Sequence, residues 1–170
     1  MLKTFNMFNL EQIDGLPLTT ETASPEATFD PLPEAENLLQ KSGANIIEKG
    51  QNAFFRSSTD EVWLPQRHLF SDAANFYATG LHELVHWSGG GKKRLNREMK
   101  GKFGSADYAE KELVAELGSA FLMADLGIVG EVQHESYIAS WLQALKNDKR
   151  YVFKAVSAAS KAHSYLMDKA

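Results

Sequence analysis

The chain has 170 residues, 44% of them hydrophobic, which suits a single domain with its own core. Its net charge of −4 argues against a basic nucleic-acid-binding protein, and the absence of cysteine excludes disulfides and thiolate metal sites. No apolar run approaches the roughly 20 residues needed to span a bilayer, and the N-terminus lacks a signal-peptide core. We therefore expect a cytoplasmic protein with no membrane partner.

The N-terminal part is predicted to be extended. A short strand comes first, and residues 17–33 then hold four of the five prolines together with several threonines. Proline and threonine at this density disfavour a helix. We predict a single domain over 1–170, with a strand and a Pro/Thr-rich strap over 1–33 and a compact core over 34–170.

The core is predicted to begin with a short helix, "EAENLLQKSG", that ends at Gly43. Three β-prone runs follow, "NIIEKG", "QNAFFRSS" and "DEVWLP", separated by turns at Gly50 and residues 57–60. These runs predict a small antiparallel sheet.

The remainder is predicted to be helical. One helix covers about 72–87 with Ser71 or Asp72 as its N-cap, and a second covers about 106–126 and ends at Gly127. Two more are expected over 131–146 and 148–167. A sheet followed by a helical bundle indicates the α+β class. The expected buried positions are Tyr77, Leu81, Leu84 and Val85 in the first helix, and Leu113, Leu117, Ala120, Phe121 and Ala124 in the second.

The stretch "LHELVHW" contains the strongest chemical signal. Residues four apart lie on one helical face, so His82 and His86 can offer two imidazoles to one metal ion. Glu83 is then close to the metal but outside its coordination shell, where it can accept a proton from a zinc-activated water. The alternative is a chance spelling in an ordinary helix. The position of both histidines off the apolar stripe favours the Zn²⁺ site.

A third ligand is needed if one coordination position is to stay open for water. The metzincin extension is ruled out, because Lys92 stands where its third histidine would be. Glu112 and Glu116 lie four apart in the second long helix, and like charges at that spacing favour a cation between them and the histidines. We assign Glu112 as the ligand and Glu116 as the group that orients an imidazole. Two alternatives remain. In the swapped assignment Glu116 is the ligand and Glu112 orients an imidazole, and in the other both glutamates are surface residues without a role in metal binding.

The motifs "FNLEQIDGL", "YATGLHELVHWSG", "RLNR", "YAEKELVAELGSAFL" and "HESYIASWLQALKNDKRYVFKA" span nearly the whole chain. In their order they resemble the C-terminal metallopeptidase-like domain of ArdC-type antirestriction proteins, also found in plasmid primases and polyvalent proteins of phages and plasmids. The resemblance implies a zincin-like fold, a metal held by His82, His86 and a glutamate, and Glu83 as the peptidase base. It also implies that DNA binding belongs to a separate upstream domain.

Other residues are weaker candidates. His134 lies in line with apolar positions of a predicted helix, and it or Tyr137 can donate to an oxyanion; a satisfied core histidine is the alternative. Lys92, Lys93, Arg94 and Arg97 belong to a basic loop that suits contact with nucleic-acid phosphate, although a solvated loop that also caps helix ends is favoured. Either "AFFRSS" or "EVWLP" can form an edge strand that pairs with an extended peptide substrate. The alternative is that both strands only cover the core, and Phe54, Phe55 and Trp63 are expected in the core.

The sequence thus predicts a zinc-dependent metallopeptidase-like domain of an antirestriction protein from a mobile genetic element. Its expected partners are a peptide or protein substrate and, as a candidate, a restriction enzyme. The alternative is a non-catalytic zinc-containing module that blocks restriction, or contacts DNA, by occupancy.

Overall fold

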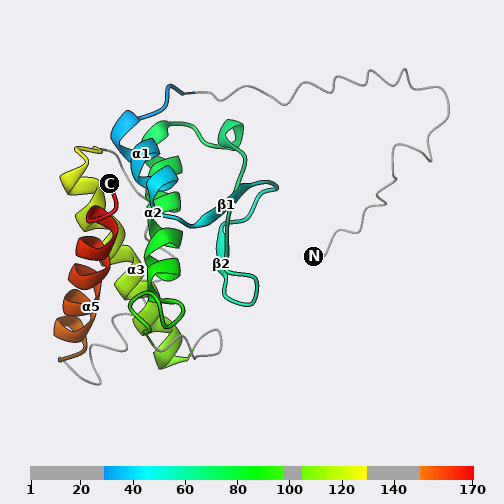
Figure 1. Ribbon diagram of the computed structural model, residues 1–170. Helices are drawn as coiled ribbons and strands as arrows, with labels where there is room; N and C mark the ends of the chain where they lie inside the picture. The colour runs from blue at the N-terminus through cyan, green and yellow to red at the C-terminus, as the bar shows by residue number, and fades with distance from the viewer. Residues whose placement is uncertain (1–28, 98–104, 130–149) are drawn as a thin grey trace, which may run out of the picture.

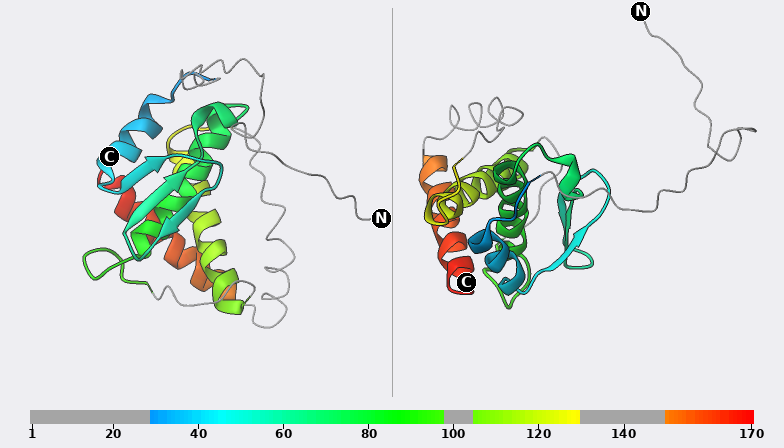
Figure 2. Two further views of the ribbon diagram at one scale, coloured as in Figure 1. Left: turned by 90° about the vertical axis from the view of Figure 1, so that its right-hand side faces the viewer. Right: turned by 90° about the horizontal axis from the view of Figure 1, so that it is seen from above.

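A computed structural model describes residues 29–97, 105–129 and 150–170. The central helix α2 has a small sheet on one side and helices α3 and α5 on the other (Figures 1 and 2). The N-terminal strand and strap predicted before residue 29 and the helix predicted over 131–146 lie outside the described residues. Within the described ranges, every helix is too short or too polar to span a bilayer. The elements are α1 (Pro33–Lys41), β1 (Asn45–Glu48), β2 (Phe54–Arg56), β3 (Glu61–Leu64), the 3₁₀ helix η2 (Arg67–Leu69), α2 (Ala73–Gly89), α3 (Ala106–Asp125) and α5 (Arg150–Met167).

The three predicted strands are present, but the sheet is mixed rather than antiparallel. Its order is β1-β3-β2, with β1 parallel and β2 antiparallel to β3. The antiparallel prediction assumed that consecutive strands form hairpins. Instead, β3 inserts between its two predecessors, and the chain through β2 supplies the return that a parallel pair requires. As a result β2 is an edge strand and β3 is the central one.

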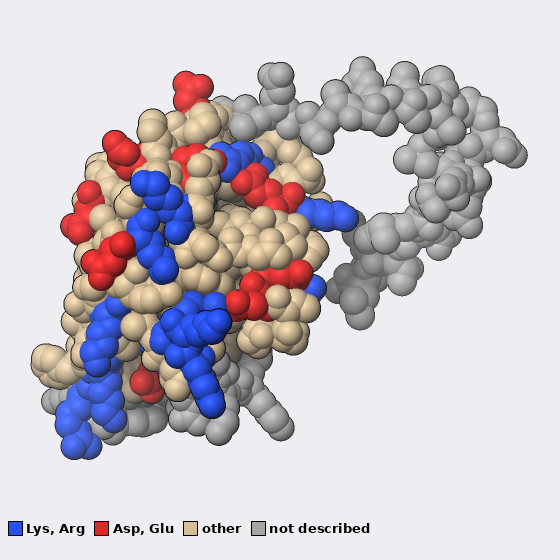
Figure 3. All heavy atoms as spheres, viewed as in Figure 1, with Lys and Arg blue, Asp and Glu red and all other residues tan. Residues whose placement is uncertain are grey.

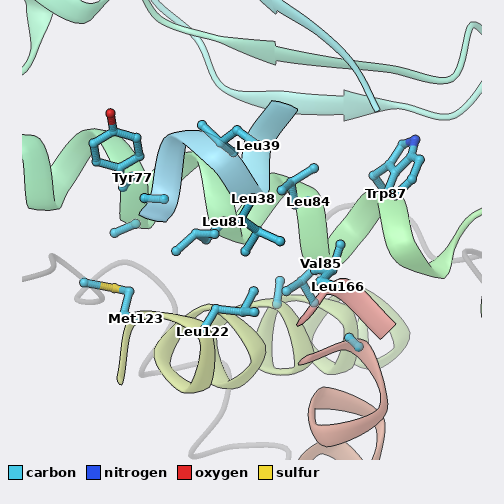
Figure 4. Packing of buried hydrophobic residues seen from close by; sticks show 14 of the residues in the cluster. Leu38, Leu39, Tyr77, Leu81, Leu84, Val85, Trp87, Leu122, Met123 and Leu166 are labelled. Carbon is cyan, nitrogen blue, oxygen red and sulfur yellow. The ribbon is translucent and has the colours of Figure 1, made fainter. Parts of the chain in front are cut away.

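Helix α2 begins where the sequence indicates. The carboxylate of Asp72 accepts a hydrogen bond from the backbone N–H of Asn75 at 2.8 Å, the geometry of an N-cap. The predicted stripe of α2 is fully buried, and Figure 4 shows side chains from α1, α2, α3 and α5 meeting around it. This packing holds α2 rigidly between the sheet and the other helices.

Helix α3 is rotated relative to the sequence prediction. Ala120 and Ala124 are exposed, whereas Ala115 and Leu122 are buried to 0% exposure. The prediction assumed one apolar stripe, but α3 packs against both α2 and α5 and so buries two faces. The second face includes polar residues, among them Ser119, whose hydroxyl donates to the carbonyl of Ala78 at 3.1 Å.

Close approach of α2 and α3 depends on Gly118. A Cβ at this position would lie 2.8 Å from Cγ2 of Val85, a buried β-branched residue with little freedom to move. We expect Gly118→Ala to lower the free energy of unfolding by up to about 2 kcal/mol, since overpacking costs about 1–3 kcal/mol and alanine returns about 1 kcal/mol of helix propensity.

The matched control is Gly80→Ala in α2. A Cβ there would meet Leu39 and Leu64 at 3.4 Å, an ordinary contact distance. We expect this variant to be neutral or more stable by up to about 1 kcal/mol. Urea denaturation of both variants measures the difference, and equal stabilisation of the two would contradict the tight α2–α3 contact.

Candidate metal centre

Helices α2 and α3 bring together three of the predicted ligands: His82, His86 and Glu112. The Nε2 atoms of the two histidines are 3.1 Å apart. One carboxylate oxygen of Glu112 lies 3.4 Å from Nε2 of His82, and the other lies 3.5 Å from Nε2 of His86. A single ligand atom from each residue can be chosen so that all three lie within 4.8 Å of one another.

These separations fit a shared metal ion. Zinc ligands lie about 2.0–2.2 Å from the ion, so two donors of a tetrahedral set are about 3.4 Å apart. The 3.1 Å between the two Nε2 atoms is close to that spacing, and so are the 3.4 Å from one Glu112 oxygen to His82 and the 3.5 Å from its other oxygen to His86. Two imidazole nitrogens and one carboxylate oxygen suit zinc, and they also suit other divalent transition metals.

The electrostatics of the cluster support the role of Glu112 as a ligand. Burial raises the pKa of Glu112, but hydrogen bonds and charge interactions with His82 and His86 outweigh it and lower the pKa to about 2. Burial lowers the pKa of His82, yet Glu112 and Glu116 outweigh that effect and raise it to about 10. Glu112 is therefore ionised at neutral pH, the state in which a carboxylate binds a metal.

Glu116 occupies a different position from Glu112. Its carboxylate lies 3.6 Å from Nδ1 of His82, on the far side of the ring from the other histidine. This is the position of a group that orients an imidazole rather than one that shares the ion. Glu112 is only 6% exposed, so the alternative of two surface glutamates does not hold for it. The geometry favours the original assignment over the swapped one.

Glu83 lies between the histidines and the sheet edge. It is 7% exposed, and the backbone of Phe55 in β2 is hydrogen-bonded to it. Burial raises the pKa of its carboxyl group above the usual value. A buried carboxylate with raised proton affinity, next to a candidate metal site, has the properties of a general base.

The cluster opens into a pocket of about 320 Å³ bounded by β2, α2 and α3. Phe54 and Phe55 line this pocket, although the sequence analysis placed them in the core. Trp63 is partly buried and stacks on Phe54 with ring centroids 5.8 Å apart. Within the described part of the chain, the sheet edge beside the pocket is that of β2, which contains part of "AFFRSS". The stretch "EVWLP" forms the central β3, so the alternative edge is excluded.

Two residues that line the pocket, Tyr108 and Lys111, were not predicted as site residues from the sequence. Tyr108 lies four residues before Glu112, one helical turn away on the same face, so the spacing rule could have found it. Lys111 directly precedes Glu112, and no spacing rule distinguishes it.

Two arginines of the basic loop after α2, Arg94 and Arg97, make structural contacts. Arg94 pairs with Asp60, with one hydrogen bond of 2.9 Å, and its guanidinium lies 4.3 Å from the centre of the Trp87 ring. Arg97 donates to the carbonyl of Val85 near the end of α2, so the expected capping of a helix end is confirmed for it. Lys92 and Lys93 are exposed.

His134 and Tyr137, the predicted donors to an oxyanion, lie outside the described residues.

Taken together, the α+β fold, the paired histidines and the glutamate on the following helix define a zincin-like domain with a candidate metal site. Comparison with known proteins agrees: residues 33–158 match the model of a family described as zincin-like metallopeptidase, and the chain belongs to that family.

Bacterial proteins match nearly the whole chain. Two DNA primases TraC of Escherichia coli are each 42% identical over 95% of this chain, which spans 11% and 15% of their lengths. Protein y4eC of Sinorhizobium fredii is 40% identical over 95% of the chain, which spans 52% of it. The chain thus corresponds to about half of this last relative and to a small part of the primases.

Solved structures of a homologue bear on the metal. The antirestriction protein ArdC of plasmid R388, in its Mn(II)-bound form, is 38% identical with a TM-score of 0.73 over 95% of this chain and 60% of that protein. Its metal-free form has a TM-score of 0.70 over 95% of this chain and 58% of that one. The chain therefore has the fold of the part of ArdC that it matches, and that homologue binds Mn(II).

Proposed function

We propose that this chain hydrolyses peptide bonds with a divalent metal, zinc by preference, held by His82, His86 and Glu112. One observation carries the proposal: the three donors converge beside a buried glutamate, in a pocket that borders β2, the edge strand of the described sheet. A binding site for a structural metal has no need for such a base or for an open pocket.

When bound, the metal supplies Lewis acidity that polarises a carbonyl and lowers the pKa of a water molecule. Glu83 then takes a proton from the attacking water and delivers it to the leaving amine nitrogen. Its burial keeps competing water away and raises its affinity for that proton. Glu116 keeps the ring of His82 in the orientation that points Nε2 into the cluster.

The substrate class follows from the edge strand. Backbone groups of β2, the edge strand of the described sheet, can pair with a peptide in extended conformation and place it across the pocket. We propose an extended segment of a protein as the substrate. Because the homologue ArdC is an antirestriction protein, we propose a restriction enzyme as the partner from which such a segment comes.

The test is cleavage of a peptide library by metal-loaded protein, read by mass spectrometry. We expect cleavage with zinc, its loss on chelation, and its return when zinc is added back. The extent of cleavage with manganese in place of zinc measures the metal preference. If protein with one bound metal ion per chain cleaves no member of a diverse library, the proposed activity is wrong.

A further inference from the structure

A second hollow lies away from the metal centre, between the loop that follows α2 and residues 150–161 of α5. It has a volume of about 560 Å³ and shares no lining residue with the metal pocket. Four of its described lining residues are cationic, namely Arg97, Arg150, Lys154 and Lys161, and none is acidic. We call this hollow the basic groove. A cationic groove in a chain of net charge −4 calls for a specific explanation.

The basic groove is built by helix geometry. Positions 150, 154 and 161 of α5 are separated by four and seven residues, so their side chains share one face. Figure 3 shows lysine and arginine side chains gathered over this part of the surface, along α5 and the loop after α2. Charges so arranged focus a positive potential into the hollow, which favours an anionic ligand.

Arg97 adds an incompletely satisfied guanidinium to the groove wall. It donates to the carbonyl of Val85 and to the hydroxyl of Ser88, and its buried Nε has no hydrogen-bond partner among the described residues. No carboxylate in the described ranges pairs with it, and burial lowers its pKa to about 10. A partly buried guanidinium that no described carboxylate pairs is stabilised by nearby negative charge, so an anion in the groove would interact favourably with Arg97.

An aromatic ring distinguishes between kinds of anion. Phe153 lines the groove and is 74% exposed. The next residue, Lys154, lines the same groove. An exposed aromatic ring beside cationic side chains is the arrangement on which unpaired nucleic-acid bases stack while their phosphates are neutralised. A peptide with acidic side chains uses the charges but gains no comparable benefit from the flat ring.

We propose that the basic groove binds single-stranded nucleic acid, with Lys154 and Lys161 contacting phosphates and Phe153 stacking on a base. A duplex fits less well, because its bases are already stacked and cannot cover the ring.

The first experiment measures the affinity of the full chain for a fluorescein-labelled oligothymidylate by anisotropy at low ionic strength. We expect Lys154→Glu/Lys161→Glu to weaken binding by at least about tenfold and to reduce the dependence on salt. The matched control is Lys41→Glu/Lys49→Glu, which makes the same charge change on the α1 and β1 side of the molecule. An equal loss in the control would show non-specific attraction and overturn the proposal.

The second experiment tests the ring. Phe153→Ala is expected to weaken binding of the single strand by about tenfold, to leave weak binding of a duplex unchanged, and to leave the melting temperature unchanged because the ring is exposed. A clear fall in melting temperature would show that the ring belongs to a packed interface and overturn the stacking role. Competition by polyglutamate as effective as that by the oligonucleotide would assign the groove to acidic peptides instead.

Discussion

Glu83→Gln is expected to reduce peptide cleavage by about 10²–10⁴-fold, the range for loss of a general base. Glutamine has nearly the same size and still accepts a hydrogen bond from the backbone of Phe55, but it cannot take up a proton. Metal binding should persist, because Glu83 is not among the three convergent donors. The measurements are initial rates on the best peptide from the library and metal content after dialysis.

An exposed glutamate provides the matched control. Glu34 lies in the first turn of α1, and Glu34→Gln makes the same chemical change far from the pocket. Its rate should equal that of the wild type. If antirestriction activity survives in metal-loaded Glu83→Gln while cleavage is lost, the chain acts by occupancy, as the binding-module alternative predicts. If cleavage itself survives, Glu83 is not the base.

Removal of Glu112 is expected to cause the largest loss of metal binding. Glu112→Ala should lower affinity by more than about a hundredfold, whereas Glu116→Gln should lower it by about 10–100-fold, the range for a group that orients a ligand. The reason is geometric: Glu112 faces both imidazoles at 3.4 and 3.5 Å, and Glu116 faces only Nδ1 of His82 at 3.6 Å. Competition with a chromophoric chelator measures both affinities.

Thermal unfolding provides a second readout of the same variants. A ligand that binds only the folded state raises the melting temperature, so zinc should stabilise the wild type. That increase should nearly vanish in Glu112→Ala and remain in part in Glu116→Gln. The reverse order of the two variants, in affinity and in melting temperature, would establish the swapped assignment.

The sequence by itself determined the local features. His82 and His86 face one direction because four residues make about one helical turn, and this holds in any fold that keeps the helix. The cap at Asp72 and the three strands also follow from local chemistry, since turn residues and alternating apolar runs need no distant partner. The candidate metal ligands were therefore identifiable from spacing and residue type alone.

Only the tertiary structure decided how these elements face one another. The rotation of α3 was misjudged from its apolar residues, because contacts with both α2 and α5 bury two faces, and this rotation directs Glu112 rather than Glu116 toward both histidines. The central place of β3, which leaves β2 at the edge, depends on pairing between strands distant in sequence. The basic groove likewise joins Arg97 to residues more than fifty positions later. Such contacts depend on packing energies summed over the whole core, which no local pattern in the chain encodes.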